Sequence, residues 1–597
     1  MSRVYDDLIL HITPDKFFIE SLSEQQLLLV IDRINHDISL QPNQKQIPPV
    51  ASRKPFHGIL GVINLISGPY LIIVTRKVRQ GTVCGGEVWR ILETEIISFS
   101  RAEHHLTPTQ LEANRKYTAM MQQVLSTPYF YFSYTYDISH SRQRLDTLGS
   151  REFYQKSLFE RSDSRFVWNK HLLQPFLSNP KLHCYALPVI HGFVSINSCS
   201  ISGHRFIWSI ISRRSTERVG TRLFVRGADE NGFVANYVET EQIVEVGTDI
   251  ASYIHTRGSI PLFWQQRPNL KYKPPPTLEP HQPHAEAFNK HFQAQVPLYG
   301  QQVIVNLIDQ KKSEGRLETS LKMIHKQVNN KDVYYEAFDF HKECSKMRWD
   351  RLSILMDRLA QYEEQFQYFH SRNGTPLLRQ TGVFRTNCID CLDRTNVVQS
   401  MLARRNLQAI LVRLGVLPDN ARIENQISVE QLFKTVWADH ADMISIQYTG
   451  TGALKTDFTR TGQRTKMGLL EDGRRSAIRY FKNNFADGFR QDSMDLFVGN
   501  HVVSPTEGVT KESPVLQERK DTRYLALPIA FALSLAMLAL SLTLPAQYST
   551  EILLSILFWT AMLGVSIHTL LKNGPDYVDQ PKLIHLSRHQ SSSLHSA

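Results

Sequence analysis

One stretch decides the expected fold of the central part of this chain of 597 residues: Phe384-Arg-Thr-Asn-Cys388-Ile-Asp390-Cys391-Leu-Asp393-Arg394-Thr395-Asn396. A short apolar run, Val383-Phe384, precedes it, and a helix is predicted to begin near Thr395. A strand, a tight loop and a helix N-terminus in this order form an anion cradle, because backbone N–H groups converge there and the helix dipole adds positive potential. The stretch therefore predicts an anion site.

The spacing of Cys388 and Arg394, with five residues between them, suits the cleavage of a phosphate ester. The loop would hold Cys388 Sγ below the phosphate, while the Arg394 guanidinium folds back to grip two equatorial oxygens. A free thiol has a pKa of about 8.5, and a helix N-terminus with a neighbouring arginine can lower that pKa by several units. We therefore predict a thiolate that attacks phosphorus in line and forms a phosphocysteine, with no metal and no cofactor.

The leaving alkoxide needs a proton from a carboxylic acid, and water must later be activated by a base. Asp390 and Asp393 are the candidates within the loop, and the sequence does not decide between them. An ionised carboxylate would oppose formation of the thiolate at Cys388, so at least one of the two should be neutral or turned away. The candidate substrate-binding residues are Asn387, Ile389, Cys391, Leu392 and Thr395 in the loop, with Lys455 and Arg460 in a Gly-rich segment. For Lys455 and Arg460 a solvated basic loop is the favoured alternative.

The pair Cys388 and Cys391 also has the Cys-x-x-Cys spacing of a zinc half-site or a redox motif. No second Cys/His pair at ligand spacing accompanies it, and no thioredoxin-like context follows. The six cysteines are scattered over the whole length, which indicates a reducing compartment rather than a disulfide framework. We therefore favour the nucleophile over both alternatives.

Two long apolar runs mark the C-terminal part of the chain. Residues 524–544 form a run of 21 without a charge, and residues 552–571 form a run of 20 in which only His568 is titratable. Each can cross a bilayer core as a helix, which takes about 20 residues. Basic residues lie outside the pair and none lies between the runs, so the positive-inside rule predicts cytosolic termini and a luminal loop. The flanking basic residues are Arg519, Lys520, Arg523, Lys572 and Lys582.

The rest of the chain is predicted to form two cytosolic units. Residues 1–180 look strand-rich, with a hairpin-like signal at Ser67-Gly68-Pro69 between residues 59–66 and 70–75. Residues 181–503 alternate strand-like stretches (206–212 and 222–225) with helix-like ones (347–369 and 407–414, which Gly415 ends), as in an α/β domain. The remaining divisions are a flexible tether at 504–523, spans at 524–544 and 552–571, a luminal loop at 545–551 and a tail at 572–597.

The composition, with 42% hydrophobic and 21% charged residues, is that of a folded globular chain. The net charge of +11 suits either a solvated basic surface with no partner or an anionic partner, which can be nucleic acid, an acidic membrane surface or a phosphorylated substrate. Two further residues have open roles. His341 could assist proton transfer, although a satisfied core histidine is favoured, and Asp339 is expected to be a helix cap or a structural pair.

The extended string around Cys388 resembles the signature of the Sac-domain phosphoinositide phosphatases. Other blocks are similar to that family too, and with the apolar pair the resemblance covers nearly the whole chain. These blocks are Phe166-Val-Trp-Asn169, Ile211-Ser-Arg-Arg214, Arg226-Gly-Ala-Asp229, Asn236-Tyr-Val-Glu-Thr-Glu-Gln242, Arg257-Gly-Ser-Ile-Pro-Leu-Phe-Trp264, Phe338-Asp-Phe-His341 and Gly450-Thr-Gly-Ala-Leu-Lys-Thr-Asp-Phe-Thr-Arg460.

The resemblance implies an N-terminal Sac subdomain packed on an α/β catalytic subdomain, with Cys388 as nucleophile and Arg394 as the phosphate-binding arginine. It implies phosphatidylinositol 4-phosphate as main substrate, with the 3-phosphate and the 3,5-bisphosphate as further ones. Phosphoinositide lipids, the acidic bilayer surface and membrane-contact-site or trafficking proteins are then the expected partners, not nucleic acid. The expected location is the endoplasmic reticulum membrane. Residues 591–597 lack the lysine-based retrieval signal of animal members, which leaves cycling to the Golgi open.

Two other functions fit part of the pattern. A protein tyrosine or dual-specificity phosphatase uses the same Cys-x5-Arg chemistry, but the flanking blocks and the apolar pair argue against it. A catalytically inactive lipid-binding scaffold would not need Cys388, Arg394 and both loop aspartates, all of which are present.

Overall fold

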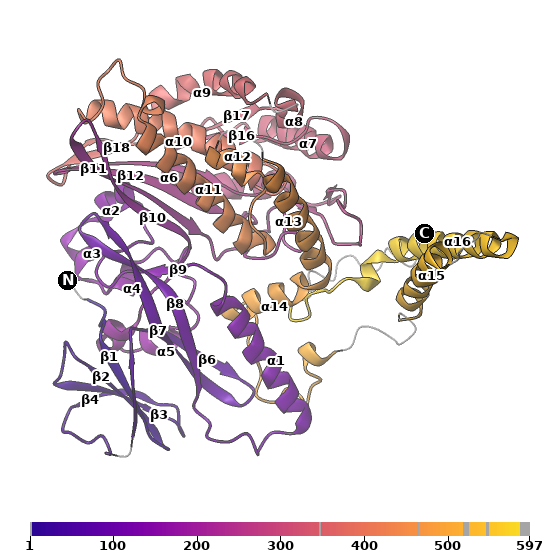
Figure 1. The fold of residues 1–597 in the computed structure, drawn as a ribbon. Coiled ribbons are helices and arrows are strands. Elements are labelled where there is room, and N and C mark those ends of the chain that lie inside the picture. Colours follow the sequence, from indigo (N-terminus) through magenta and orange to yellow (C-terminus); the bar gives the residue numbers. More distant parts are fainter. Residues whose placement is uncertain are drawn as a thin grey trace.

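The computed structural model describes residues 3–49, 51–345, 348–461, 465–517, 525–544 and 549–584. The chain begins with a small antiparallel sheet of five strands in the order β4-β3-β2-β1-β5 (Figure 1). Apolar side chains of this sheet pack on the second sheet in one core that contains Leu10, Phe17, Leu29 and Ile73. The strands are β1 (Leu8–Ile12), β2 (Lys16–Ser21), β3 (Leu27–Asp32), β4 (Ile38–Pro42) and β5 (Ser52–Phe56).

A second, long sheet runs through both halves of the chain in the order β17-β16-β20-β13-β12-β11-β10-β9-β8-β7-β6. The three-residue strand β9 pairs with β8 on one side and β10 on the other, so the sheet continues across residue 180. Its members are β6 (Ile59–Leu65), β7 (Gly68–Val83), β8 (Gly86–Ser98), β9 (Phe130–Phe132), β10 (Ile190–Ile201), β11 (His204–Arg214), β12 (Val238–Val246), β13 (Asp249–Arg257), β16 (Gln301–Asn306), β17 (Val333–Ala337) and β20 (Gly382–Asn387).

The part of this sheet that carries the predicted anion loop is parallel. Strand β20 lies between β13 and β16 and runs parallel to both, and β17 extends the parallel set at the edge. All six residues of β20 are buried, as expected for a central parallel strand covered on both faces. The helices around it are α6 (His284–Tyr299), α7 (Lys312–Val328), α9 (Leu352–Phe366), α10 (Asp393–Arg413) and α11 (Ile427–Thr449). The predicted mixed α/β class is confirmed.

Several local predictions can be compared with these elements. The hairpin around Gly68 is confirmed, since Leu65 pairs with Gly68 where β6 meets β7. The strand at 206–212 is confirmed as β11, and the helix end at Gly415 is confirmed by its φ of 71°. The strand predicted at 222–225 is wrong: this segment is a turn, because Arg222 folds toward the loop after β20 and hydrogen-bonds there.

The helix predicted at 347–369 is shorter than expected. Its first residue lies outside the described ranges, and the helix itself, α9, ends at Phe366. Gln367 then has a φ of 56°, a conformation that a helix cannot continue through. Residues from Phe369 on pair with β13 as the strand β18 (Phe369–Arg372), followed by β19 (Thr375–Leu378).

Two apolar helices, α15 (Ala526–Thr543) and α16 (Thr550–Lys572), pack on each other beside the folded part (Figure 1). Their most apolar windows have mean hydropathies of 2.1 and 1.8, and only 6% of each window is buried. Such exposed apolar length is typical of a membrane-associated hairpin. Of the predicted flanking residues, Arg519, Lys520 and Arg523 lie outside the described residues, as do Tyr524 at the start of the first run and residues 545–548 and 585–597.

The segment predicted as a flexible tether is packed on the protein over its described part, residues 504–517. The side chain of Gln110, in α1 (Pro108–Leu125), donates to the Pro505 carbonyl oxygen at 3.3 Å, and the Tyr117 hydroxyl donates to Glu507 at 2.7 Å. Val515 is buried against the same helix. The prediction of flexibility is therefore wrong for these residues, because Pro505, Glu507 and Val515 all have contacts with α1.

The chain that follows α16 also returns to the folded part. The Asp579 amide donates to the Asn484 carbonyl oxygen at 2.7 Å, and the Lys582 amide donates to the Asp492 carboxylate at 2.8 Å. Asp492 lies in α14 (Asp487–Val498), next to the end of α13 (Lys466–Phe485). Segments on both sides of the two apolar helices, residues 504–517 before them and 574–584 after them, thus pack on the folded part.

Candidate active site

The predicted loop lies where β20 ends and α10 begins. Cys388 follows the last residue of the strand directly, and Asp393 is the first residue of the helix. The Cys388 side chain is almost fully buried, at 3% exposed. Cys391 takes a left-handed φ of 53°, which turns the chain sharply enough to bring its backbone back toward Cys388. The carboxyl end of a parallel strand and a helix N-terminus therefore meet at Cys388, as the sequence predicts.

Two groups hydrogen-bond to the Cys388 sulfur. The Cys391 backbone N–H lies 3.1 Å from Sγ, and the Thr395 hydroxyl lies 3.5 Å from it. Burial by itself raises the pKa of Cys388. Hydrogen bonding with Cys391 and the positive charge of Arg394 outweigh burial and lower the pKa from 9.0 to about 6. Cys388 is therefore a thiolate at neutral pH.

The second cysteine has the opposite character. The Cys391 thiol donates to the Gly258 carbonyl oxygen at 3.0 Å and to the Cys388 carbonyl oxygen at 3.2 Å. Burial, together with the neighbouring Cys388, raises the pKa of Cys391 well above its ordinary value. Cys391 therefore stays a thiol and serves as a donor that shapes the loop.

Two fully buried arginines support the loop from below. Arg257, at the end of β13, donates to the Cys391 carbonyl oxygen over 3.5 Å and to the Asn396 side-chain oxygen over 3.3 Å. Arg385, in β20, donates to the Ser259 carbonyl oxygen at 2.6 Å. Burial lowers the pKa of each guanidinium to about 10, so both remain charged at neutral pH. Their charges add to the positive potential under the anion site.

Asp390 is tied to two arginines of the turn at 222–226. Arg222 donates from Nε at 2.9 Å, and Arg226 donates at 2.7 Å to the same carboxylate. Burial would raise the pKa of Asp390, but these two guanidinium groups hold it well below its usual range. The Asn236 side chain also donates to the Asp390 backbone oxygen at 3.2 Å. Asp390 is thus an ionised carboxylate whose charge is compensated.

Asp393 has a different environment. Its carboxylate accepts a hydrogen bond from the Leu454 amide at 3.1 Å. Burial raises the pKa of Asp393 above its ordinary value, and the nearby charges of Arg479 and Lys455 offset this only in part. Of the two loop aspartates, Asp393 is the one that can hold a proton closer to neutral pH, which is what a general acid needs.

Arg394 lies on the first turn of α10 and is held by the segment after β16. Its guanidinium donates to the Leu307 carbonyl oxygen at 2.9 Å and to both carboxylate oxygens of Glu314, at 3.1 and 3.2 Å, with Asp309 at 3.4 Å. These groups fix the guanidinium close enough to Cys388 for its charge to lower the pKa of that thiol. Arg394 is thus both oriented and partly neutralised by Glu314 of α7 and by the segment between β16 and α7.

The other candidate residues fall into two groups. Asn387, Ile389, Leu392 and Thr395 all lie in or under the loop: the Asn387 side chain donates to Asn306, and Leu392 packs with Tyr448. Lys455 is exposed, with its Nζ 5.9 Å from the centre of the Trp349 ring. Arg460 pairs instead with Asp439 at 2.8 Å and Asp442 at 3.2 Å, away from the loop.

The structure also shows the positions of Asp339 and His341, whose roles the sequence left open. Asp339 caps the short helix α8 (Phe340–Glu343) by accepting from the Lys342 amide at 3.1 Å, so the predicted cap is confirmed. The core position favoured for His341 is wrong, since its side chain is 64% exposed and is hydrogen-bonded to Asp309 at 2.6 Å. Phe340 takes the buried position of that helix and leaves His341 on the outside.

The sequence reasoning missed the groups that hold the loop in shape, which are Arg222, Arg226, Arg257, Arg385 and Glu314. Arg226 and Arg257 each open one of the quoted sequence blocks, so they could have been identified as candidates from the blocks themselves. No sequence pattern marks Arg222 or Glu314 as a residue of the site, because only the fold brings them to the loop. Within the described residues, no group of three or more His, Cys, Asp or Glu side chains is placed to hold a metal ion.

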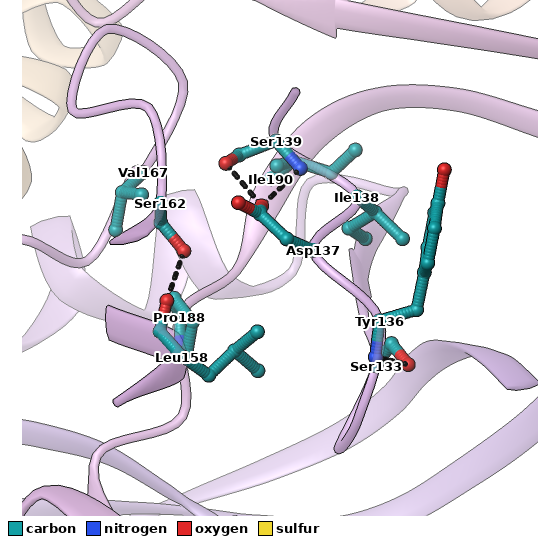
Figure 2. A pocket seen from close by; sticks show the side chains of 10 residues that line it. All are labelled: Ser133, Tyr136, Asp137, Ile138, Ser139, Leu158, Ser162, Val167, Pro188 and Ile190. Atoms are coloured by element: carbon teal, nitrogen blue, oxygen red, sulfur yellow. Dashed lines mark hydrogen bonds between the residues drawn. The ribbon is translucent and has the colours of Figure 1, made fainter. Parts of the chain in front are cut away.

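A small cavity lies apart from this site, in the N-terminal half (Figure 2). Its acidic lining residue, Asp137, accepts from the Ser139 amide at 3.0 Å and is hydrogen-bonded to His140 at 2.8 Å. Because this carboxylate is already fully engaged, the cavity has the character of a packing gap and not of a second reactive centre.

Fold and site together define the class of protein: an α/β chain with a buried, low-pKa cysteine between a strand and a helix whose first turn carries an arginine, suited to thiolate attack on a phosphate ester. A family model described as the SacI homology domain matches residues 57–345. The phosphatidylinositol-3-phosphatase SAC1-A of Danio rerio is 47% identical over 586 residues, which cover 98% of this chain and 99% of that protein.

Two further relatives extend this comparison. The phosphatidylinositol-3-phosphatase SAC1 of Drosophila melanogaster is 47% identical over 592 residues, 98% of each chain. The enzyme of the same name from Saccharomyces cerevisiae is 34% identical over 565 residues, 91% of this chain and 87% of its own. The chain therefore belongs to the Sac1 family of phosphoinositide phosphatases.

Proposed function

We propose that this protein removes the phosphate from phosphatidylinositol 4-phosphate through a phosphocysteine on Cys388, with the 3-phosphate and the 3,5-bisphosphate as further substrates. The observation that carries the proposal is the environment of Cys388, a buried thiol whose pKa is lowered to about 6. Both animal relatives are named phosphatidylinositol-3-phosphatases, which supports the substrate class. The preference for the 4-phosphate comes from the family resemblance.

In the proposed first step the Cys388 thiolate attacks phosphorus, the S–P bond forms and the bond from phosphorus to the inositol oxygen breaks. Asp393 donates its proton to that leaving oxygen, since its pKa is raised whereas that of Asp390 is held low. In the second step, ionised Asp393 takes a proton from water, the water oxygen attacks phosphorus, and the S–P bond breaks to return the thiolate. Arg394 and the loop amides hold the phosphate oxygens in both steps.

The membrane arrangement belongs to the same proposal. The helices α15 and α16 would span the bilayer of the endoplasmic reticulum as a hairpin, with both termini in the cytosol and with cycling to the Golgi. Lys572 and Lys582 flank the second helix on one side, which supports a cytosolic tail. The expected partners are then phosphoinositide lipids and the acidic bilayer surface.

The test compares substrates and one variant. Phosphate release is measured in EDTA from liposomes that hold phosphatidylinositol 4-phosphate, from matched liposomes with the other isomers, and from a phosphotyrosine peptide. We expect release from the lipids and not from the peptide, loss of release with Cys388→Ser, and a labelled phosphocysteine after acid quenching of the wild type. Preferential release from the peptide would favour a protein tyrosine phosphatase, and undiminished release by Cys388→Ser would refute the nucleophile.

A further inference from the structure

The helix α13 (Lys466–Phe485) carries an unpartnered apolar stripe. Met467, Leu470, Phe481 and Phe485 are 73%, 68%, 59% and 43% exposed. Together with the intervening exposed Ala477 they lie three or four residues apart, or a multiple of that, and so share one face of the helix. A soluble surface seldom presents four large apolar side chains in one row, so this face has a function other than solvation.

Basic side chains accompany the stripe. Lys466 and Arg474 are exposed charged residues of α13. The acidic Glu471 on the same helix is engaged by Arg474 at 2.8 Å and by Arg475 at 2.9 Å. An apolar row with basic side chains beside it is the pattern of a helix that lies in the surface of an anionic bilayer.

A loop next to α13 has the same composition. The Tyr480 hydroxyl donates to the Leu270 carbonyl oxygen at 2.7 Å and holds the loop against the helix. The next three residues, Lys271-Tyr272-Lys273, are all exposed, with Tyr272 at 65%. A tyrosine between two lysines is typical of the headgroup level of a membrane, where the ring is half immersed and the charges meet phosphate.

The position of α13 in the fold points to the bilayer that holds α15 and α16. The chain that leaves α16 at Lys572 contacts the C-terminal end of α13 seven residues later, where the Asp579 amide donates to the Asn484 carbonyl oxygen. Gly574 packs directly on Asn269, at the base of the 271–273 loop. The C-terminal end of the apolar stripe therefore lies within a few residues of the chain that follows α16, and Figure 1 shows α13 on the side of the folded part that faces the hairpin.

We propose that α13 is an interfacial helix that inserts Met467, Leu470, Phe481 and Phe485 into the surface of the bilayer in which the hairpin is anchored. Lys466 and Arg474, with Lys271 and Lys273 on the adjacent loop, then contact anionic headgroups. The occupant of this face is the lipid bilayer itself. The hairpin tethers the enzyme to the membrane, and α13 sets the orientation of the catalytic part on it.

The same helix holds the segment next to the active-site loop. Arg475 donates to the Ala453 carbonyl oxygen at 2.6 Å, and Arg479 donates to the Gly452 carbonyl oxygen at 2.9 Å. The following residue, Leu454, donates its amide to Asp393. Seating α13 on the bilayer therefore places the 452–454 segment, and with it Asp393, at the level of the lipid headgroups.

The test uses the full chain in proteoliposomes of phosphatidylcholine and phosphatidylserine. A photoreactive amino acid at position 481 or 485 is compared with one at Ile427, which is 84% exposed on α11. We expect lipid adducts at 481 and 485 and none at 427, by mass spectrometry. This arm does not use the catalytic activity, so it can fail or succeed independently of the proposed function.

The second arm uses the triple variant Leu470→Glu, Phe481→Glu and Phe485→Glu, with Met323→Glu and Ile427→Glu together as the matched control. Phosphate release from phosphatidylinositol 4-phosphate in the same bilayer should fall about tenfold in the triple variant and not in the control. Release from a soluble short-chain analogue should be unchanged in both. Equal activity of the triple variant on bilayer substrate, or lipid adducts at 427 as frequent as at 481, would overturn the proposal.

Discussion

The guanidinium of Arg226 binds the side chain of Asp390 at 2.7 Å, while a second nitrogen of the same group donates to the Ile389 carbonyl oxygen at 2.8 Å. One buried arginine thus holds both the side chain and the backbone of the loop that carries Cys388. An ionised carboxylate two residues from the thiolate would raise the pKa of Cys388, and Arg226 with Arg222 compensates that charge. Asp390 therefore serves to fix the loop.

This division of roles gives the first prediction, which concerns the two loop aspartates. Asp393→Asn should lower kcat on a phosphoinositide by about 100-fold, because the inositol oxygen is a poor leaving group and needs the proton. The same variant should lose far less on p-nitrophenyl phosphate, whose leaving group needs no proton. Steady-state rates on both substrates measure the difference.

Asp390→Asn is the matched control, since it changes the neighbouring carboxylate in the same way. It should lower the rate on both substrates to a similar extent, because it leaves Arg222 and Arg226 without their anion and disturbs the loop. An Asp390→Asn enzyme that is impaired on the lipid only would reverse the assignment of the acid.

The second prediction concerns the pH at which Cys388 reacts. Because its pKa is lowered to about 6, alkylation by iodoacetamide should reach half of its maximal rate near that pH. Thr395→Val removes the hydroxyl that hydrogen-bonds to Sγ and should move the midpoint upward. Peptide mapping of the alkylated cysteine follows the reaction, and a midpoint near the ordinary thiol value would contradict the proposed activation.

The lowered pKa has a consequence for stability as well. A thiol with a lower pKa in the folded state stabilises that state most above its unfolded pKa, and the contribution is lost as the pH falls through the folded value. The free energy of unfolding of the wild type should therefore exceed that of Cys388→Ser, and the difference should grow from pH 6 to pH 9. These limits are the pKa of Cys388 in the folded protein, about 6, and its ordinary pKa of 9.0. Denaturant titrations at several pH values measure the margin.

A third prediction concerns the chain that returns from the membrane helices. A Cβ at Gly574 would lie 2.0 Å from the Asn269 carbonyl oxygen, so Gly574→Ala must push residues 574–584 off the folded part. We expect a cost of about 1–3 kcal/mol in the free energy of docking and faster cleavage near residue 579 by limited proteolysis. Gly564→Ala is the control, since a Cβ there meets nothing within 4 Å.

The local pattern around Cys388 predicted the strand, the loop and the helix, because each of these is determined by neighbouring residues. It could not choose between Asp390 and Asp393, because the choice depends on Arg222 and Arg226, which lie more than 160 positions earlier in the chain. The strand predicted at 222–225 is wrong for another reason, since this segment is a turn. Its apolar Val225 is buried in a turn, and burial alone does not distinguish a turn from a strand.

The last prediction concerns Glu314, which holds Arg394 by two hydrogen bonds. Glu314 competes with a bound phosphate for the same guanidinium, and its charge offsets that of Arg394. In Glu314→Gln the amide can still accept one hydrogen bond, so the arginine keeps its place while only Asp309, at 3.4 Å, still offsets its charge. Orthovanadate should then inhibit more tightly, by about threefold to tenfold, and the pKa of Cys388 should fall further.

The matched control is Glu318→Gln, one turn further along α7, where the carboxylate accepts from the Tyr335 hydroxyl at 3.3 Å instead of contacting Arg394. It should leave both the inhibition constant and the alkylation midpoint of Cys388 unchanged. If Glu314→Gln weakens vanadate binding instead, the glutamate acts mainly to orient the arginine, and the competition between carboxylate and phosphate for Arg394 is refuted.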